Sequence, residues 1–350
     1  MRAMVILGAT LWLGVRDAPA QTSQRYSLAG DDVAIYNLAG TIRVEGGSGS
    51  AVVVEVTRGG ADAAKLDVAT GPIGRRETLR VIYPDDDVVY RLQGVHSSSE
   101  LDVRDDGTFN GDHRGFGRGR RIRINGTGSG TEAYADLRIV VPAGKRLAVY
   151  LAVGKMTATN VNDDLTLDVN AADVTTTGTR GSLVVDAGSG NVRVTDATGD
   201  LTLDTGSGNV TATGVRGDNL RIDTGSGDVT VDGAELRLLS IDTGSGNADA
   251  TAVRAHDLTI DTGSGNVTLG LVAGGGLIEI DTGSGDVTIT LPADYGADVL
   301  LDTGSGGIDL GGIPVTVRRV DADHVEGRIG DGRGRLRIGT GSGGVRLRKA

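Results

Sequence analysis

The fold of this chain is decided by the segment Leu201-Thr-Leu-Asp-Thr-Gly-Ser-Gly-Asn-Val-Thr-Ala-Thr213, one copy of a tandem repeat. Its centre, Asp-(Ala/Thr)-Gly-Ser-Gly, occurs seven times at steps of 18 to 21 residues. The aspartates of these copies are Asp186, Asp204, Asp223, Asp242, Asp261, Asp281 and Asp302. Self-similarity at a short period is typical of a repeat architecture, in which each unit buries its apolar face only against its neighbours.

Apolar and polar residues alternate on both sides of the Gly-Ser-Gly triplet. Leu201 and Leu203 alternate with polar residues before it, and Val210 and Ala212 do so after it. A period of two is typical of a half-buried β-strand, so each repeat should form two strands joined at a glycine corner. We expect glycine to supply the positive φ that this corner needs.

Two arrangements fit this alternation, a parallel solenoid and an antiparallel meander of hairpins. The near-constant period favours the solenoid, because stacked coils place like residues in ladders. We therefore predict an all-β fold, a parallel β-solenoid (β-helix-like) of tandem two-strand coils of about 19 residues, with a less regular N-terminal β region. Gly339 replaces the aspartate in a last copy, 37 residues beyond Asp302, so an irregular coil is expected between them.

Three regions are predicted. Residues 1–20 have the features of a signal peptide: Arg2 is followed by a largely apolar run, and Ala18-Pro-Ala20 matches an A-x-A cleavage site. Residues 21–140 form an N-terminal β region with a flexible loop at about 94–120, and residues 141–350 form the solenoid. No segment has the roughly 20 apolar residues of a membrane span, so we expect an exported protein, periplasmic, cell-surface or extracellular, with no transmembrane segment.

Composition excludes several classes of function. The formal net charge of −11 argues against nucleic acid as a partner. The chain has no cysteine, which excludes a disulfide framework, thiolate metal ligands and a cysteine nucleophile.

The sequence resembles a known family in its signal peptide, Asn37-Leu-Ala-Gly-Thr-Ile-Arg-Val-Glu45, Val141-Pro-Ala-Gly144 and the tandem Gly-Ser-Gly-(Asn/Asp)-Val units. It is similar to the bacterial DUF4097 family, β-strand-repeat proteins often described as adhesins. The resemblance covers most of the mature chain and is closest over residues 141–310. It implies an exported β-solenoid and provides no catalytic residues to transfer.

No enzyme motif emerges from the repeats. Aspartic proteases carry Asp-Thr-Gly, but they need two carboxylates sharing one proton, and nothing here singles out a pair among the tandem copies. A glycosidase also needs two carboxylates at a set separation, and the repeats lack the aromatic platforms that bind sugars. The four histidines are scattered: His96, His113, His256 and His324. We expect no enzyme activity, no catalytic residues and no cofactor.

The stacked aspartates are the main chemical feature. Asp204, Asp223, Asp242, Asp261 and Asp281 have outward parity and would stack at coil spacing. Unit charges about 4.8 Å apart repel by about 0.9 kcal/mol even in water. Either each carboxylate caps its own corner, which we favour, or the ladder recruits calcium.

A second charged feature is the basic run from Arg114 to Arg123. It could contact anionic lipid or polysaccharide, although a solvated loop and strand edge is the simpler interpretation.

These observations predict an exported bacterial scaffold or binding protein, adhesin-like and non-catalytic, whose partner is an unknown surface ligand or cell-envelope component. The alternative is a periplasmic or secreted polysaccharide-binding or polysaccharide-processing protein.

Overall fold

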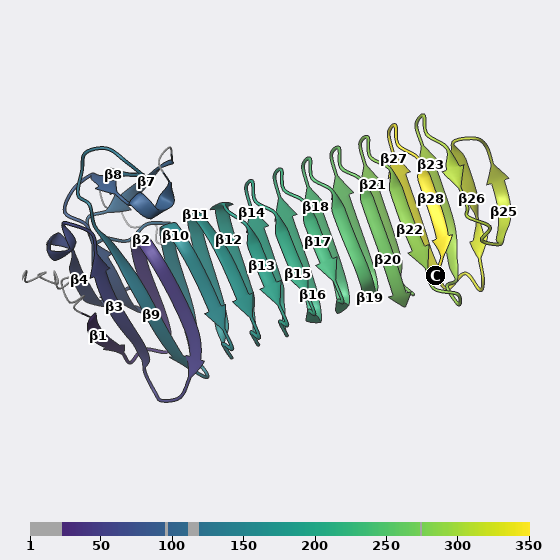
Figure 1. Ribbon diagram of the computed structural model, residues 1–350. Helices are drawn as coiled ribbons and strands as arrows, with labels where there is room; N and C mark the ends of the chain where they lie inside the picture. The colour runs from purple at the N-terminus through teal and green to yellow at the C-terminus, as the bar shows by residue number, and fades with distance from the viewer. Residues whose placement is uncertain (1–22, 95–96, 111–118, 274) are drawn as a thin grey trace, which may run out of the picture.

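The computed structural model describes residues 23–94, 97–110, 119–273 and 275–350. The predicted signal peptide therefore lies outside the described residues. The described part is all-β, with two 3-10 helices of three residues each, η1 (Ala63–Lys65) and η2 (Arg91–Gln93). It forms a long rod of stacked coils with a wider N-terminal end (Figure 1). No described helix has the length and apolar character that crossing a bilayer requires.

The coils stack in parallel, which confirms the solenoid and excludes the meander. Asp204 lies between Asp186 and Asp223 in one ladder, and Val210 lies between Val192 and Val229 in the other. The first-strand ladder contains β12 (Leu183–Ser189), β14 (Leu201–Thr205), β16 (Arg216–Thr224), β18 (Glu235–Thr243), β19 (Ala248–Thr262) and β21 (Leu277–Thr282). The second-strand ladder contains β13 (Val192–Thr195), β15 (Val210–Thr213), β17 (Val229–Asp232), the start of β19, β20 (Val267–Ala273) and β22 (Val287–Leu291).

The core is a thin column of aliphatic side chains between the two ladders. Leu203, Ile222, Ile241 and Ile260 occupy one row, and each is at most 1 % exposed. A slip of one residue would turn the whole row to solvent, so burial fixes the register of every coil.

The corner glycines are needed for a reason that differs from the expected one. Among the described Gly-Ser-Gly corners between residues 188 and 285, Gly190 alone has a φ in the left-handed region. The others sit where backbones stack: a Cβ added to Gly227 would lie 1.9 Å from the carbonyl oxygen of Gly208 in the coil below. The expectation of positive φ at this corner was therefore wrong, and close backbone approach is the physical requirement.

Positive φ occurs instead where six successive coils lead into the next one. The six residues there have φ between 51° and 69° and recur at coil spacing. They are Asn160, Gly178, Asp196, Gly214, Gly233 and Ala252.

The solenoid begins earlier in the chain than its regular repeats. β2 (Asp32–Gly47) pairs in parallel with β10 (Arg146–Thr159) over both halves of the coil, and β10 pairs likewise with β11 (Asp164–Thr177). The chain between β2 and β10 adds strands that broaden this end of the rod (Figure 1). They are β3 (Val52–Gly59), β4 (Asp67–Ile73), β5 (Arg76–Ile82) and β9 (Tyr134–Pro142), with β1 (Ser23–Leu28) on β3.

A small separate sheet contains part of the expected loop at 94–120. It consists of β6 (Asp87–Val89), β7 (Ser98–Arg104) and β8 (Gly119–Asn125). The expectation of a loop was wrong for β7, because Leu101 and Val103 alternate with polar residues and are buried on pairing with β8. Residues 95–96 and 111–118 lie outside the described residues.

The C-terminal coils do not stack in chain order. β27 (Gly334–Thr340) pairs in parallel with β21 on one side and with β23 (Ala297–Thr303) on the other. β28 (Val345–Lys349) likewise lies between β22 and β24 (Ile308–Asp309). The chain between them forms the antiparallel hairpin β25 (Val315–Val320) and β26 (His324–Ile329) beyond β23. The expected irregular coil between Asp302 and Gly339 was therefore wrong, because the later coil is inserted before the earlier one (Figure 1).

Candidate functional site: an acidic row along the solenoid

One row of carboxylates follows the outward side of the first-strand ladder. Each aspartate lies directly opposite the next one in the parallel register. We call this the acidic row, and its members are Asp168, Asp186, Asp204, Asp223, Asp242, Asp261 and Asp281. The structure thus brings together all five aspartates of the predicted calcium ladder. All but Asp168 are exposed to solvent.

The carboxylates of the acidic row do not cap the corners; the adjacent threonines do. Thr224 is 1 % exposed, and its Oγ1 accepts a hydrogen bond from the Gly227 N–H at 3.1 Å while donating to the Gly208 carbonyl at 3.1 Å. The same arrangement recurs at Thr205, Thr243, Thr262, Thr282 and Thr340. Corner capping by aspartate was therefore a wrong interpretation. Each threonine satisfies a buried amide in its own coil and links to the coil below.

A second polar column binds the coils together just after each corner. The backbone N–H of Asn209 donates to the Asn191 side-chain oxygen at 3.2 Å, and the N–H of Asp228 donates to the Asn209 oxygen at 2.9 Å. The column continues through Asn247, Asn266 and Asp286 to the N–H of Gly344. From the Asn or Asp that follows the first six Gly-Ser-Gly triplets of the tandem repeat, the sequence predicts side-chain bonds to nearby backbone at the corner. It does not indicate that each side chain accepts from the backbone of the next coil.

The N-terminal end of the acidic row is covered by the inserted chain. Tyr36 and Tyr150 occupy the same row before Asp168, and their rings stack 4.4 Å apart beneath Phe109. Asn110 Nδ2 donates to Asp168 Oδ1 at 2.7 Å and to Asn170 Oδ1 at 2.9 Å. This cover could not be anticipated, because nothing near Asn110 in the sequence indicates the coil on which it lies.

Burial and repulsion from neighbouring carboxylates raise the pKa of three members of the acidic row, Asp168, Asp204 and Asp242. The pKa of Asp168 is raised to about 6, mainly by burial, with a smaller upward contribution from the Asp186 carboxylate and an opposing one from the hydrogen bond that Asn110 donates. Partial burial, and then the neighbouring carboxylates, raise the pKa values of Asp204 and Asp242. At these three positions the ionised carboxylate is unfavourable, and protonation or a bound cation would relieve it.

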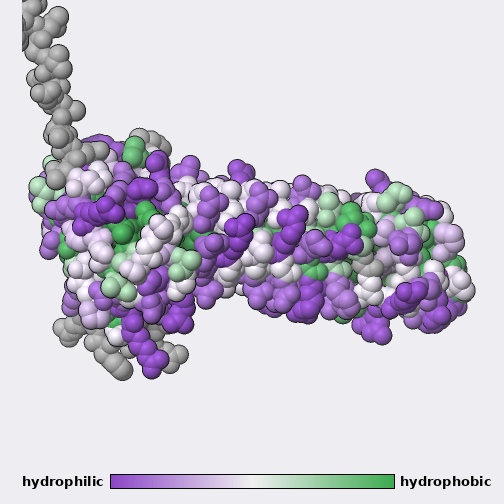
Figure 2. Space-filling view, turned by 90° about the horizontal axis from the view of Figure 1, so that it is seen from below, coloured by the Kyte–Doolittle hydropathy of each residue, from purple (hydrophilic) through white to green (hydrophobic). Residues whose placement is uncertain are grey.

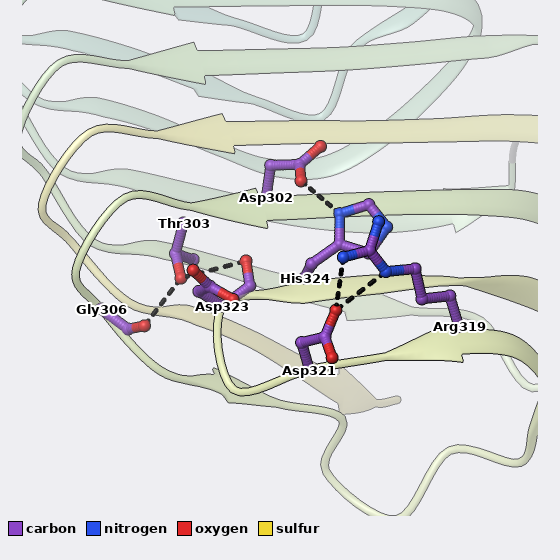
Figure 3. Close-up of polar contacts among 7 residues, drawn as sticks. All are labelled: Asp302, Thr303, Gly306, Arg319, Asp321, Asp323 and His324. Carbon is purple, nitrogen blue, oxygen red and sulfur yellow. Dashed lines mark hydrogen bonds and ion pairs between the residues drawn. The ribbon is translucent and has the colours of Figure 1, made fainter.

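Near its C-terminal end the acidic row is interrupted by a glycine, and the next aspartate contacts a histidine. Gly339 lies between Asp281 and Asp302 in the register, so no carboxylate occupies that coil. Asp302 Oδ1 lies 2.5 Å from His324 Nδ1, and the two side chains point toward one another in Figure 3. Arg319, in β25, pairs at 2.8 Å with Asp321 in the turn between β25 and β26.

The described residues contain no group of three or more His, Cys, Asp or Glu side chains placed to hold a metal ion. The acidic row supplies one carboxylate per coil and so forms a line rather than a cage. Calcium binding by Asp204, Asp223, Asp242, Asp261 and Asp281 stays a prediction.

The other polar features are dispersed. His256 lies 3.0 Å from its neighbour Asp257 and far in sequence from His324, while His96 and His113 lie outside the described residues. In the described part of the basic run, Arg120 pairs with Asp86, Arg121 with Asp102, and Arg123 with Asp87 and Glu100.

Comparison with known proteins identifies the family. The model of the Toastrack DUF4097 family matches residues 136–348. The chain belongs to the DUF4097 family. The regular repeats of this DUF4097 protein and nearly all of its inserted last coil lie within the matched range, and the resemblance seen in the sequence is confirmed.

Two solved structures are similar to this DUF4097 protein over nearly the whole chain. A "putative cell adhesion protein" from Clostridium sporogenes ATCC 15579 is 8 % identical with a TM-score of 0.21, covering 94 % of this chain and 100 % of its own. A "putative adhesin" from Bacteroides fragilis NCTC 9343 is 11 % identical with a TM-score of 0.33, covering 95 % and 100 %. No curated protein matches the sequence.

Proposed function

We propose that this DUF4097 protein is an exported, non-catalytic scaffold that binds a component of the cell envelope or a surface ligand. The observation that supports this proposal most is the uniformity of the acidic row. Six successive coils, from Asp186 to Asp281, present the same carboxylate at the same place. A catalytic site needs unlike groups that converge on one reacting atom, whereas a repeated row suits binding of an extended or repetitive partner.

The alternative, a polysaccharide-binding or polysaccharide-processing protein, has one supporting observation. A polar cleft lies between the small sheet and the coil corners, lined in part by Ser98, Ser99, Asp173 and Ser189. None of the residues lining it is aromatic, and Tyr36, Tyr150 and Phe109 are at most 3 % exposed. The face of the rod in Figure 2 is mainly hydrophilic, with only small apolar patches. Stacking platforms for sugar rings are therefore lacking in this cleft.

Export is tested by the N-terminus of the protein recovered from the producing bacterium. We expect cleavage after Ala20, which removes Trp12, the single tryptophan of the chain. Mass spectrometry of the mature protein should give Gln21 as the first residue, and its fluorescence should lack tryptophan emission. Protein that is recovered outside the cytoplasm but begins at Met1 would contradict the signal peptide.

Binding is tested with purified residues 21–350 and isolated envelopes of the producing bacterium. We expect saturable sedimentation with the envelopes, and loss of it when Asp204, Asp223 and Asp242 are all replaced by Asn. A matched control replaces three aspartates outside the acidic row, Asp218, Asp249 and Asp294, by Asn. It loses the same number of charges and should bind as the wild type does. Release of reducing ends from envelope polysaccharide would favour the alternative instead.

Calcium binding by the acidic row is tested by thermal denaturation. The aspartates of the row do not cap the corners, so replacing one of them removes a charge without removing a cap. We expect the melting temperature to change little when millimolar calcium is added or chelated. Asp242→Asn should raise the free energy of unfolding by less than about 1 kcal/mol, because it reduces repulsion between neighbouring carboxylates. If the row binds calcium, the ion must raise the melting temperature by mass action, and the Asn variant must weaken that effect.

A further inference from the structure

The inserted position of the last coil creates a slot. We call residues 334–349 the C-terminal coil, and we call the space that it fills, between β21/β22 and β23/β24, the C-terminal slot. Among the described residues, β23 pairs only with β26 and β27, and β24 pairs only with β28. Within the described residues, coil 297–309 is therefore joined to coil 277–291 by strand pairing only through the C-terminal coil.

The C-terminal coil matches the slot in shape. Leu336, Ile338, Val345 and Leu347 are each at most 2 % exposed, and Thr340 Oγ1 donates to the Gly285 carbonyl at 3.0 Å as the equivalent threonines do in other coils. The hydrogen bonds continue on the far side, where the Gly304 N–H donates to the Thr340 carbonyl at 2.8 Å. Both strand ladders of the solenoid thus pass through the inserted coil.

Charge also matches the coil to the slot. The C-terminal coil has five basic residues and no acidic one: Arg335, Arg337, Arg346, Arg348 and Lys349. Each wall of the slot has three acidic residues and no basic one: Glu279, Asp281 and Asp286 in residues 277–291, and Asp298, Asp302 and Asp309 in residues 297–309. A basic strand between two acidic ones explains why the coils stack out of chain order.

The register brings these charges together. Arg337 lies directly opposite Glu279 on one wall, and Arg335 lies opposite Asp298 on the other. Arg346 Nε lies 3.5 Å from Asp309 Oδ2. Stacking coil 297–309 on coil 277–291 in the same register would instead place Asp302 against Asp281.

The C-terminal coil is joined to β26 by a short turn, residues 330–333, in which Gly330 and Gly332 have φ of 52° and 70°. When the coil leaves the slot, it exposes unpaired strand edges on both walls, and such edges readily pair with another chain. Every copy of the protein carries both the slot and a segment that fits it in shape and charge.

We propose that the C-terminal slot is a strand-exchange site, through which copies of this protein associate by inserting the C-terminal coil of one copy into the slot of another. Exchange keeps all the contacts of the coil and changes only the turn at 330–333, the usual condition for swapping an element between protomers. The partner is thus a second copy of this chain, selected by its basic strand.

Single-cysteine variants test this directly, because the wild-type chain has no cysteine. One full-length protein carries Glu279→Cys and another carries Arg337→Cys, positions that face each other across the slot wall. The two are mixed in denaturant, refolded together at high protein concentration and oxidised. We expect a disulfide-linked heterodimer, with mass spectrometry joining residue 279 of one molecule to residue 337 of the other.

A control pair and a second slot pair complete the experiment. The control pair is Thr202→Cys with Arg337→Cys. Thr202 is exposed on the same strand ladder as Glu279 but lies several coils away from the slot. Asp298→Cys with Arg335→Cys tests the other wall. Several-fold more heterodimer from either slot pair than from the control supports exchange. Equal yields from slot and control pairs, or no heterodimer from both slot pairs, overturn it.

Discussion

At the scale of single residues, the positions that lead from one coil to the next require a positive φ, and one of them holds a residue that disfavours it. Most of these turn positions hold Gly, Asn or Asp, the residues that tolerate a left-handed conformation, but Ala252 adopts φ of 51°. An alanine in this conformation is strained by contact between its Cβ and the following carbonyl.

Replacing Ala252 by glycine should therefore stabilise the protein. The strain that glycine relieves is about 1–2 kcal/mol. The entropy that a glycine loses on folding costs about 0.5–1 kcal/mol. We therefore expect the free energy of unfolding to rise by about 0.5 kcal/mol. Chemical denaturation measures it. Ala250→Gly, two residues earlier in β19 at a buried position, is the matched control and should destabilise.

Asp168 makes stability depend on pH. Its pKa in the folded state is about 6, against 3.8 for an unperturbed aspartate, so the folded protein binds the proton more tightly than the unfolded chain. This contribution is fully present below about pH 4 and is lost as the pH rises through about 6. The loss amounts to about 2 kcal/mol after allowance for screening by solvent.

Asp168→Asn should abolish that part of the pH dependence while keeping an oxygen that accepts from Asn110. Denaturation midpoints between pH 4 and pH 7 should fall with rising pH in the wild type and fall less in the variant. Asp249→Asn removes the same charge outside the acidic row. A variant whose profile parallels that of the wild type would show that Asp168 is not the titrating group.

At the scale of the element, each strand has one core-facing and one solvent-facing side. Ile260 is 0 % exposed, and its neighbour Thr259 lies between Ser240 and Glu279 on the outer side. Ile260→Asp buries an unpaired charge and should cost several kcal/mol. Thr259→Asp adds only a partly exposed like charge beside Glu279, a cost below about 1 kcal/mol. Comparable losses in thermal stability for the two variants would contradict the register.

The elements that were predicted well are those whose signals are local. Alternation and the 19-residue period place Leu203 and Ile260 in the core, because side-chain parity and the glycine corner are properties of the segment itself. The threonine caps were missed because both Asp204 and Thr205 carry oxygens near the corner, and only the burial of Thr205 decides between them.

The parts that could not be predicted depend on contacts between distant segments. The sequence has Gly339 at two periods from Asp302, yet the coil of Gly339 stacks before that of Asp302, between it and Asp281. In the same way, Asn110 covers Asp168 only because the chain inserted between β2 and β10 folds back over the coils. Repeat period carries no information about either contact.

At the scale of the whole molecule, charge is segregated along the rod. The chain carries a formal net charge of −11, and the acidic row occupies its middle coils, yet the C-terminal coil is entirely basic among its charged residues. Neighbouring coils therefore repel in the middle of the rod and attract at the slot. The two regions should respond to ionic strength in opposite directions.

Raising salt from about 0.1 M to about 1 M shortens the Debye length from about 10 Å to about 3 Å. Screening should weaken repulsion between Asp223, Asp242 and Asp261, and so increase the amide protection of β16, β18 and β19. It should also weaken attraction of the C-terminal coil to the slot and decrease the protection of β27 and β28. Hydrogen exchange followed by mass spectrometry measures both regions in one sample. A change of the same sign in both would mean that salt acts through general hydration, and that charge does not hold the C-terminal coil in its slot.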